Sequence, residues 1–155
     1  MTQKNRISRH ELDKKHKVRK IAIYVRCAAE SQEGAMRQKR RIKSYVWRQN
    51  RKVTGWGAVC GVYVDNGISG FNRERQQLNA LLRDIERGVV DTVIATDPAR
   101  ISRSPFDFDE FVEHLEKNGS ELILLWPKPE RKIFVKMSIG FSPRKRPDQK
   151  LGRSR

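Results

Sequence analysis

The sequence has few of the residues that build disulfide frameworks, metal sites and membrane anchors. Its 155 residues include 2 cysteines, Cys27 and Cys60, and 3 histidines. Two cysteines this far apart offer neither a disulfide framework nor the spacing of a metal-binding motif. No apolar run approaches the roughly 20 residues of a membrane helix, and the N-terminus has no apolar signal core. We therefore expect a cytoplasmic protein with no cofactor, no metal and no membrane partner.

Acidic residues are few relative to basic ones. The chain has 34 Lys and Arg against 18 Asp and Glu, a net charge of +16. Residues 1–20 carry 8 basic and 2 acidic side chains, residues 141–155 carry 6 and 1, and residues 21–140 carry 20 and 15. Basic arms are typical of proteins that bind a polyanion, because each neutralised phosphate releases condensed counterions. The alternative is a pair of solvated tails that bind nothing in particular.

The chain does contain short apolar runs that alternate with helical repeats. Leu78, Leu81, Leu82 and Ile85 have helical spacing, with Gly88 as the stop. A second such helix starts at Ser104-Pro105 and ends at Asn118-Gly119. A basic helix is expected from about residue 33 to 49. Its inward face would be Met36, Ile42, Tyr45 and Val46. The apolar runs are of the kind that form buried strands: residues 21–26, 58–65, 92–96 and 121–126.

This alternation predicts an α/β fold with three layers. Strand–helix–strand units give a mainly parallel sheet of four to five strands with helices on both faces. Residues 131–141 are expected to add a fifth strand, at an antiparallel edge. We expect a basic N-terminal arm at 1–19, one domain at 20–140 and a basic tail without fixed structure at 141–155.

Arginines gather in three predicted loops that follow strands, residues 26–29, 65–75 and 96–105. Ligands of parallel sheets bind at these carboxyl ends. Arg26, Arg75, Arg100 and Arg103 could converge there, and guanidinium groups match the oxygens of a phosphodiester. The alternative is that they pair with acids on an exposed rim, the candidates being Asp65, Glu74 and Asp97.

Together these segments resemble the catalytic domain of the serine site-specific recombinases, the resolvase/invertase family. The resemblance covers about residues 20–126 and keeps both order and spacing. It rests on the following positions: Tyr24-x-Arg26, Gln32, Gln38, Asp65, Gly67-Ile68-Ser69-Gly70, Arg75, Leu78, Gly88 and Arg100-Ile-Ser-Arg103-Ser104.

The resemblance implies a reaction. In that family a serine two positions after the first arginine attacks a DNA phosphodiester and forms a transient 5′-phosphoseryl bond, while arginines stabilise the charged transition state. By this resemblance the catalytic positions are Ala28, where the family has its nucleophile, Ser69 of the Ser-Gly loop, and the arginines Arg26, Arg75, Arg100 and Arg103.

The chain departs from the family at the position of the nucleophile, which is Ala28. The methyl group of an alanine cannot attack phosphorus. A second departure is Ala99, at a place where the family usually has an aspartate. Cys27 is expected to pack in the core, and Ser31 to cap the following helix. Whether Ala28 is natural or engineered stays open. We also expect neither the family's dimerisation helix nor its DNA-reading module in this chain.

We therefore expect a domain that binds nucleic acid, DNA rather than RNA, without cleaving it. The expected binding residues are Arg26, Arg73, Arg75, Arg100, Arg103, Lys14, Lys15, Lys17, Arg144, Lys145 and Arg146. One alternative is an active recombinase, with an unrecognised nucleophile or one complemented by another subunit in a homo- or hetero-oligomer. The other is a scaffold that docks on RNA or a ribonucleoprotein.

Overall fold

The fold is built around a five-stranded sheet. The computed structural model describes residues 17–27, 32–66, 75–126 and 131–133. The strand order is β2-β1-β3-β4-β5, in which the first four strands are parallel and β5 runs antiparallel to β4. The strands are β1 (Arg19–Arg26), β2 (Gly57–Asp65), β3 (Thr92–Ala95), β4 (Glu121–Leu124) and β5 (Arg131–Ile133).

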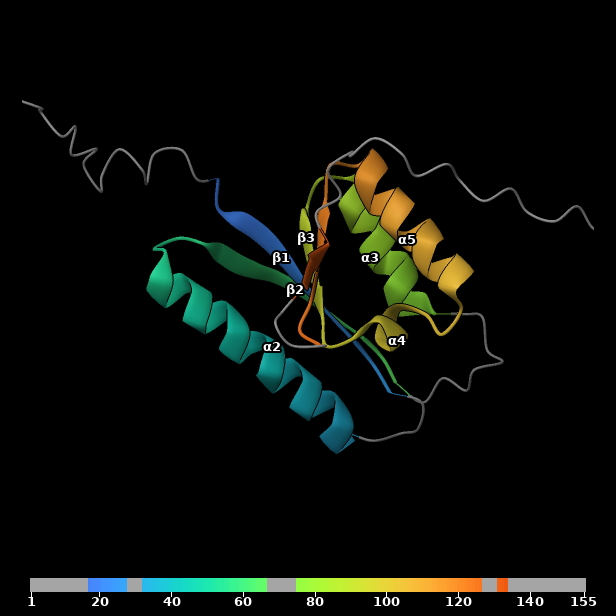
Figure 1. Cartoon of the computed structure of the whole chain (residues 1–155), viewed down its shortest axis with the longest axis horizontal. Coiled ribbons are helices and arrows are strands. Elements are labelled where there is room, and N and C mark those ends of the chain that lie inside the picture. The colour runs from blue at the N-terminus through green and yellow to red at the C-terminus, as the bar shows by residue number, and fades with distance from the viewer. Residues whose placement is uncertain (1–16, 28–31, 67–74, 127–130, 134–155) are drawn as a thin grey trace, which may run out of the picture.

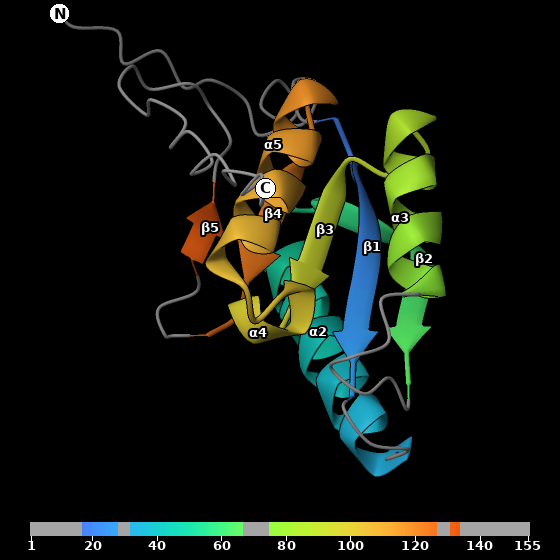
Figure 2. The same cartoon turned by 90° about the vertical axis from the view of Figure 1, so that its right-hand side faces the viewer.

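Helices cover both faces of the sheet, as Figures 1 and 2 show. Of the helices in the described residues, α2 lies on one face, and α3, α4 and α5 lie on the other. The helices are α2 (Gln32–Lys52), α3 (Gln76–Glu86), α4 (Pro98–Ile101) and α5 (Pro105–Lys117). The predicted three-layer, mainly parallel fold is confirmed.

Alternation along β1 explains the two layers of core. Successive side chains of a strand point to opposite faces. Ile21, Ile23 and Val25 pack in the cluster under α2. Ala22 and Tyr24 pack in the cluster under α3 and α5. The central strand is therefore buried on both sides, which is why its sequence is an unbroken apolar run.

Two predictions about the elements were wrong. Met36 was expected on the inward face of α2 but is 53% exposed, and Ala35 and Gln38 are buried instead. At about 100° per residue, Met36 lies about 120° around the helix from Ile42, whereas Ala35 lies within about 20°. Residues 96–105 were expected as a loop, yet they contain the short helix α4.

The topology brings the ends of the parallel strands to one edge of the sheet. β1 ends at Arg26, β2 at Asp65 and β3 at Ala95. Lys17 is exposed and precedes β1, so it lies near the opposite edge of the sheet, where the parallel strands begin. At the end of β2, the predicted turn from Asp65 runs into residues outside the described ones. In the described part of the chain, no helix is both long and apolar enough to cross a membrane.

Candidate active site

The short helix α4 holds two of the predicted arginines in place through its backbone. The Nη2 atom of Arg26 donates to the carbonyl of Ala99 at 2.8 Å. The Nη2 atom of Arg75 donates to the carbonyl of Arg100 at 2.8 Å, and its Nη1 atom donates to the carbonyl of Ile101. The last carbonyls of a helix have no partner within it and carry partial negative charge. These bonds place guanidinium groups from two other segments beside α4.

Arg100 completes the link between α4 and β1. Its Nη1 atom donates to the carbonyl of Arg26 at 3.2 Å, and its Nε atom pairs with Asp97 Oδ2 at 3.2 Å. Asp97 is thus the one candidate acid that pairs with an arginine among the described residues. Asp65 makes no such pair there, and Glu74 lies outside the described part. The arginines are held mainly by carbonyl groups, so most of their charge is not neutralised.

Asp65 and Tyr24 connect the site to α3. The Tyr24 hydroxyl donates to Asp65 Oδ2 at 2.8 Å, and it accepts a hydrogen bond from Arg75 Nη2. The Asp65 carboxylate also accepts from the backbone N–H groups of Gln77 and Leu78, both at 3.0 Å. Burial raises the pKa of Tyr24 well above its ordinary value, and the charge of Asp65 adds to this while Arg75 opposes it. The phenol therefore stays protonated at neutral pH, as its hydrogen bond to Asp65 requires.

The positive charges of the site interact with one another. Burial lowers the pKa of Arg26, and the charges of Arg75, Arg103 and Arg100 lower it further, while Tyr24 opposes them. Arg26 remains charged at neutral pH because an arginine starts from a pKa far above 7. An anion placed among these groups would relieve the repulsion. We call Arg26, Arg75, Arg100 and Arg103 the arginine cluster.

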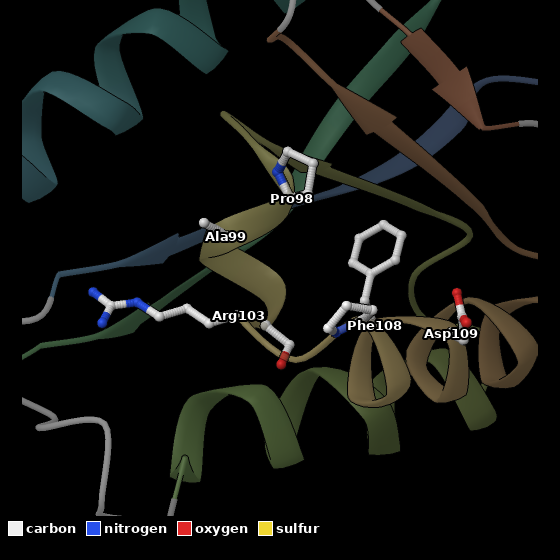
Figure 3. Close-up of a pocket in the computed structure, with 7 residues that line it drawn as sticks. Pro98, Ala99, Arg103, Phe108 and Asp109 are labelled. Atoms are coloured by element: carbon white, nitrogen blue, oxygen red, sulfur yellow. The ribbon is translucent and has the colours of Figure 1, made fainter. Parts of the chain in front are cut away.

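A pocket of about 600 Å³ lies beside the arginine cluster, between α4 and α5. In Figure 3, Phe108 and Pro98 face each other across it, and the guanidinium of Arg103 extends away from Phe108. Arg103 is exposed, whereas Arg26, Arg75 and Arg100 are partly buried. The pocket is lined by Pro98, Ala99, Ser102, Arg103, Pro105, Phe108 and Asp109.

The other predicted site residues fall into two groups. Lys17 is described, but it lies near the opposite edge of the sheet from the arginine cluster. The remainder lie outside the described residues: Ala28, Ser69, Arg73, Lys14, Lys15, Arg144, Lys145 and Arg146. The structure thus brings together four of the predicted arginines and leaves the nucleophile position itself undescribed.

Two features of the site region were not predicted. Gln38 Nε2 donates to the carbonyl of Arg26 at 3.1 Å and contacts Cys27 Sγ at 3.4 Å, which fixes the end of β1 to α2. The second feature is how much charge α2 carries. The helix was expected to be basic, and it has 8 basic residues against 1 acidic residue. Since residues 21–140 carry 20 basic and 15 acidic side chains, α2 accounts for more than their whole net charge. Summing charge over this helix alone would have revealed it.

Comparison with known proteins identifies the family. Residues 21–146 match the family described as "Resolvase, N terminal domain". The chain belongs to this family. A "Putative DNA recombinase" of Bacillus subtilis (strain 168) is 33% identical over 123 residues, which are 76% of this chain but 23% of that protein. The chain thus spans about a quarter of the length of this curated relative.

Solved structures agree with the resolvase assignment. The N-terminal catalytic domain of TP901-1 integrase superposes with a TM-score of 0.60 and 32% identity, over 68% of this chain and 77% of that one. A resolvase family site-specific recombinase from Streptococcus pneumoniae gives a TM-score of 0.58 at 25% identity, over 70% and 72%. The predicted membership of the serine site-specific recombinases is confirmed.

Proposed function

We propose that this resolvase-family domain acts in DNA recombination or its regulation, and that it grips a DNA phosphodiester without cleaving it. The arginine cluster makes the contact, and the basic segments around Lys14 and Arg144 extend it along the backbone. The observation that carries the proposal is the fixing of Arg26 and Arg75 by the carbonyl groups of α4. Arg26 keeps N–H groups that can donate to the oxygens of a phosphate. Arg75 has one Nη1 N–H left, because its Nε atom is buried and its other Nη hydrogens already donate to α4 and Tyr24.

The lack of cleavage follows from position 28. The family reaction requires a serine oxygen to form a bond to phosphorus while the 3′-oxygen of the neighbouring nucleotide leaves. Ala28 has no such oxygen. Cys27 is a poor substitute, because the residue is only 6% exposed and its side chain packs under α2, where Gln38 contacts the sulfur. A buried thiol cannot reach a phosphodiester without a rearrangement of the strand end.

Binding of duplex DNA over a salt series tests the arginine cluster. Arg103→Ala is the sharpest variant, because Arg103 is exposed and its loss leaves the backbone contacts of α4 intact. We expect the affinity to fall about tenfold and the slope of log K against log salt to decrease by about 1. Lys117→Ala, which removes the same charge at an exposed position near the opposite edge of the sheet, should change both much less. Equal effects of the two variants would reject the cluster as the contact.

Supercoiled plasmid DNA tests the absence of cleavage. We expect the unaltered chain to give neither nicks nor a covalent protein–DNA adduct with any divalent ion. Ala28→Ser restores the missing oxygen, and an adduct through that serine would indicate that the rest of the site is competent. An adduct formed by the unaltered chain would overturn the proposal and favour an active recombinase with another nucleophile.

A further inference from the structure

The exposed side of α2 carries a concentrated positive charge. Two rows of side chains run along it at helical spacing, and every member of both rows is exposed. We call these rows the outer face of α2: Met36, Arg40, Lys43, Trp47 and Arg51 in one row, and Arg37, Arg41, Ser44, Arg48 and Lys52 in the other. Seven of the ten are basic, and the one acidic residue of the helix is Glu33 in its first turn.

Nothing in the described fold neutralises this charge. The three ion pairs found among the described residues involve Arg19, Arg100 and His114, and none involves α2. Like charges four residues apart, such as Arg37 with Arg41 and Arg48 with Lys52, destabilise a helix. The stability of α2 therefore gives no reason for the pattern, whereas a polyanionic partner does.

Trp47 is an exposed aromatic side chain in the middle of these cations. It is 59% exposed, and the guanidinium of Arg51 lies 4.9 Å from its ring centroid. An indole in water beside a guanidinium presents one flat apolar surface next to a positive charge. Unpaired nucleic-acid bases stack on such surfaces while neighbouring cations contact the phosphates.

We infer that the outer face of α2 binds a single-stranded polynucleotide, with a base stacked on Trp47 and phosphates paired with the two basic rows. From Arg37 to Lys52 the helix rises about 22 Å, enough to follow several phosphates of one strand. A duplex keeps its bases stacked inside and offers none to Trp47. A lipid surface fits less well, because the apolar side of α2 is buried against the sheet and cannot enter a membrane.

This surface is separate from the arginine cluster. Figures 1 and 2 show α2 on one face of the sheet, with α3, α4 and α5 on the other. Only the first turns of α2 approach the cluster, where Gln38 contacts the carbonyl of Arg26. The two surfaces can therefore be tested with separate variants of the full chain.

Stacking is tested with an oligodeoxythymidylate and an oligouridylate of equal length. Trp47→Ala should weaken the binding of both about tenfold and remove most of the quenching of tryptophan fluorescence. Trp126→Ala is the matched control, because Trp126 is 57% exposed; it should leave both affinities within about twofold of the unaltered chain. Equal effects of the two variants would overturn the inference.

Charge is tested with pairs of substitutions. Arg37→Gln with Arg48→Gln should lower oligonucleotide affinity at least tenfold and reduce the salt slope by about 1.4, the value for two contacts on a single strand. The control pair, Arg87→Gln with Lys117→Gln, removes the same charge from exposed positions just after α3 and at the end of α5. It should have a much smaller effect. If both pairs act alike, or if the α2 pair loses only the binding of anionic lipid vesicles, the inference is rejected.

Failure here is distinguishable from failure of the proposed function. Arg103→Ala reports on the duplex contact at the arginine cluster, and Trp47→Ala reports on α2. Loss of duplex affinity in Arg103→Ala, with oligonucleotide binding unchanged in Trp47→Ala, rejects the α2 inference alone. The reverse pattern rejects the cluster and supports α2.

Discussion

At the scale of single residues, the side chain of Asp65 joins Tyr24 to the start of α3. One buried carboxylate accepts hydrogen bonds from Tyr24 and from two N–H groups at the start of α3. Arg75, which precedes that helix, contacts the same tyrosine. Asp65 therefore positions Arg75 indirectly, although it does not touch that guanidinium.

Asp65→Ala should lower the free energy of unfolding by about 3 kcal/mol, because it leaves several buried donors without a partner. Asp65→Asn, which keeps the shape and part of the hydrogen bonding, should cost about half as much. Urea denaturation followed by circular dichroism measures both. The exposed control Glu116→Gln should change stability by less than about 0.5 kcal/mol. A loss that small for Asp65→Ala would contradict the role given to this residue.

The positions of the arginines were predictable from the sequence, but their contacts were not. Strand ends and family spacing marked Arg26, Arg75, Arg100 and Arg103. No pattern indicates that a guanidinium will bind a particular carbonyl, because every residue carries the same acceptor. The hydrogen bonds to Ala99 and Arg100 follow from the placement of α4, and proline at its first position gave only a weak signal for so short a helix.

At the scale of elements, the helix ends were predicted well because they depend on local chemistry. Ser104 caps α5 by accepting from the N–H of Asp107, and α3 ends just before Gly88, which has φ of 70°. Both signals need only a few neighbouring residues. The predicted inward face of α2 was partly wrong, because it included Met36, which is exposed, in place of the adjacent Ala35, which is buried. The basic character of α2 was predicted. The size of its charge was not, because net charge was summed over residues 21–140 as a whole.

Gly88→Ala should lower the free energy of unfolding by about 1 kcal/mol, because an alanine pays a conformational penalty at positive φ. No atom lies within 4 Å of the place where its Cβ would stand, so a clash is not the cause. Gly88→Asn should cost less, since asparagine tolerates this backbone conformation better. Thermal unfolding compares the two with Val89→Ala, an exposed neighbour. Equal melting temperatures for Gly88→Ala and the unaltered chain would contradict the account.

At the scale of the whole molecule, the crowding of like charges predicts that anions stabilise the fold. Sulfate at ten times its dissociation constant should add about 1.4 kcal/mol and raise the melting temperature by about 4 °C, relative to chloride at equal ionic strength. Arg103→Ala should lose much of this shift, whereas Lys117→Ala should keep it. The double variant Arg37→Gln with Arg48→Gln measures how much of the shift in melting temperature comes from sulfate bound at α2. The same shift in every variant would place the effect outside the arginine cluster.

The strand order also governs how this chain is assembled during translation. β1 is the first strand of the described residues to be made, yet one of its neighbours, β3, ends only at Ala95. Until β3 has emerged from the ribosome, β1 can pair only with β2, and Ile21 and Ile23 lie on the unpaired edge of this two-stranded sheet. Sheets closed by such distant partners form slowly and are prone to mispairing while they wait. A nascent chain stalled before Ala95 would therefore be a natural client for molecular chaperones.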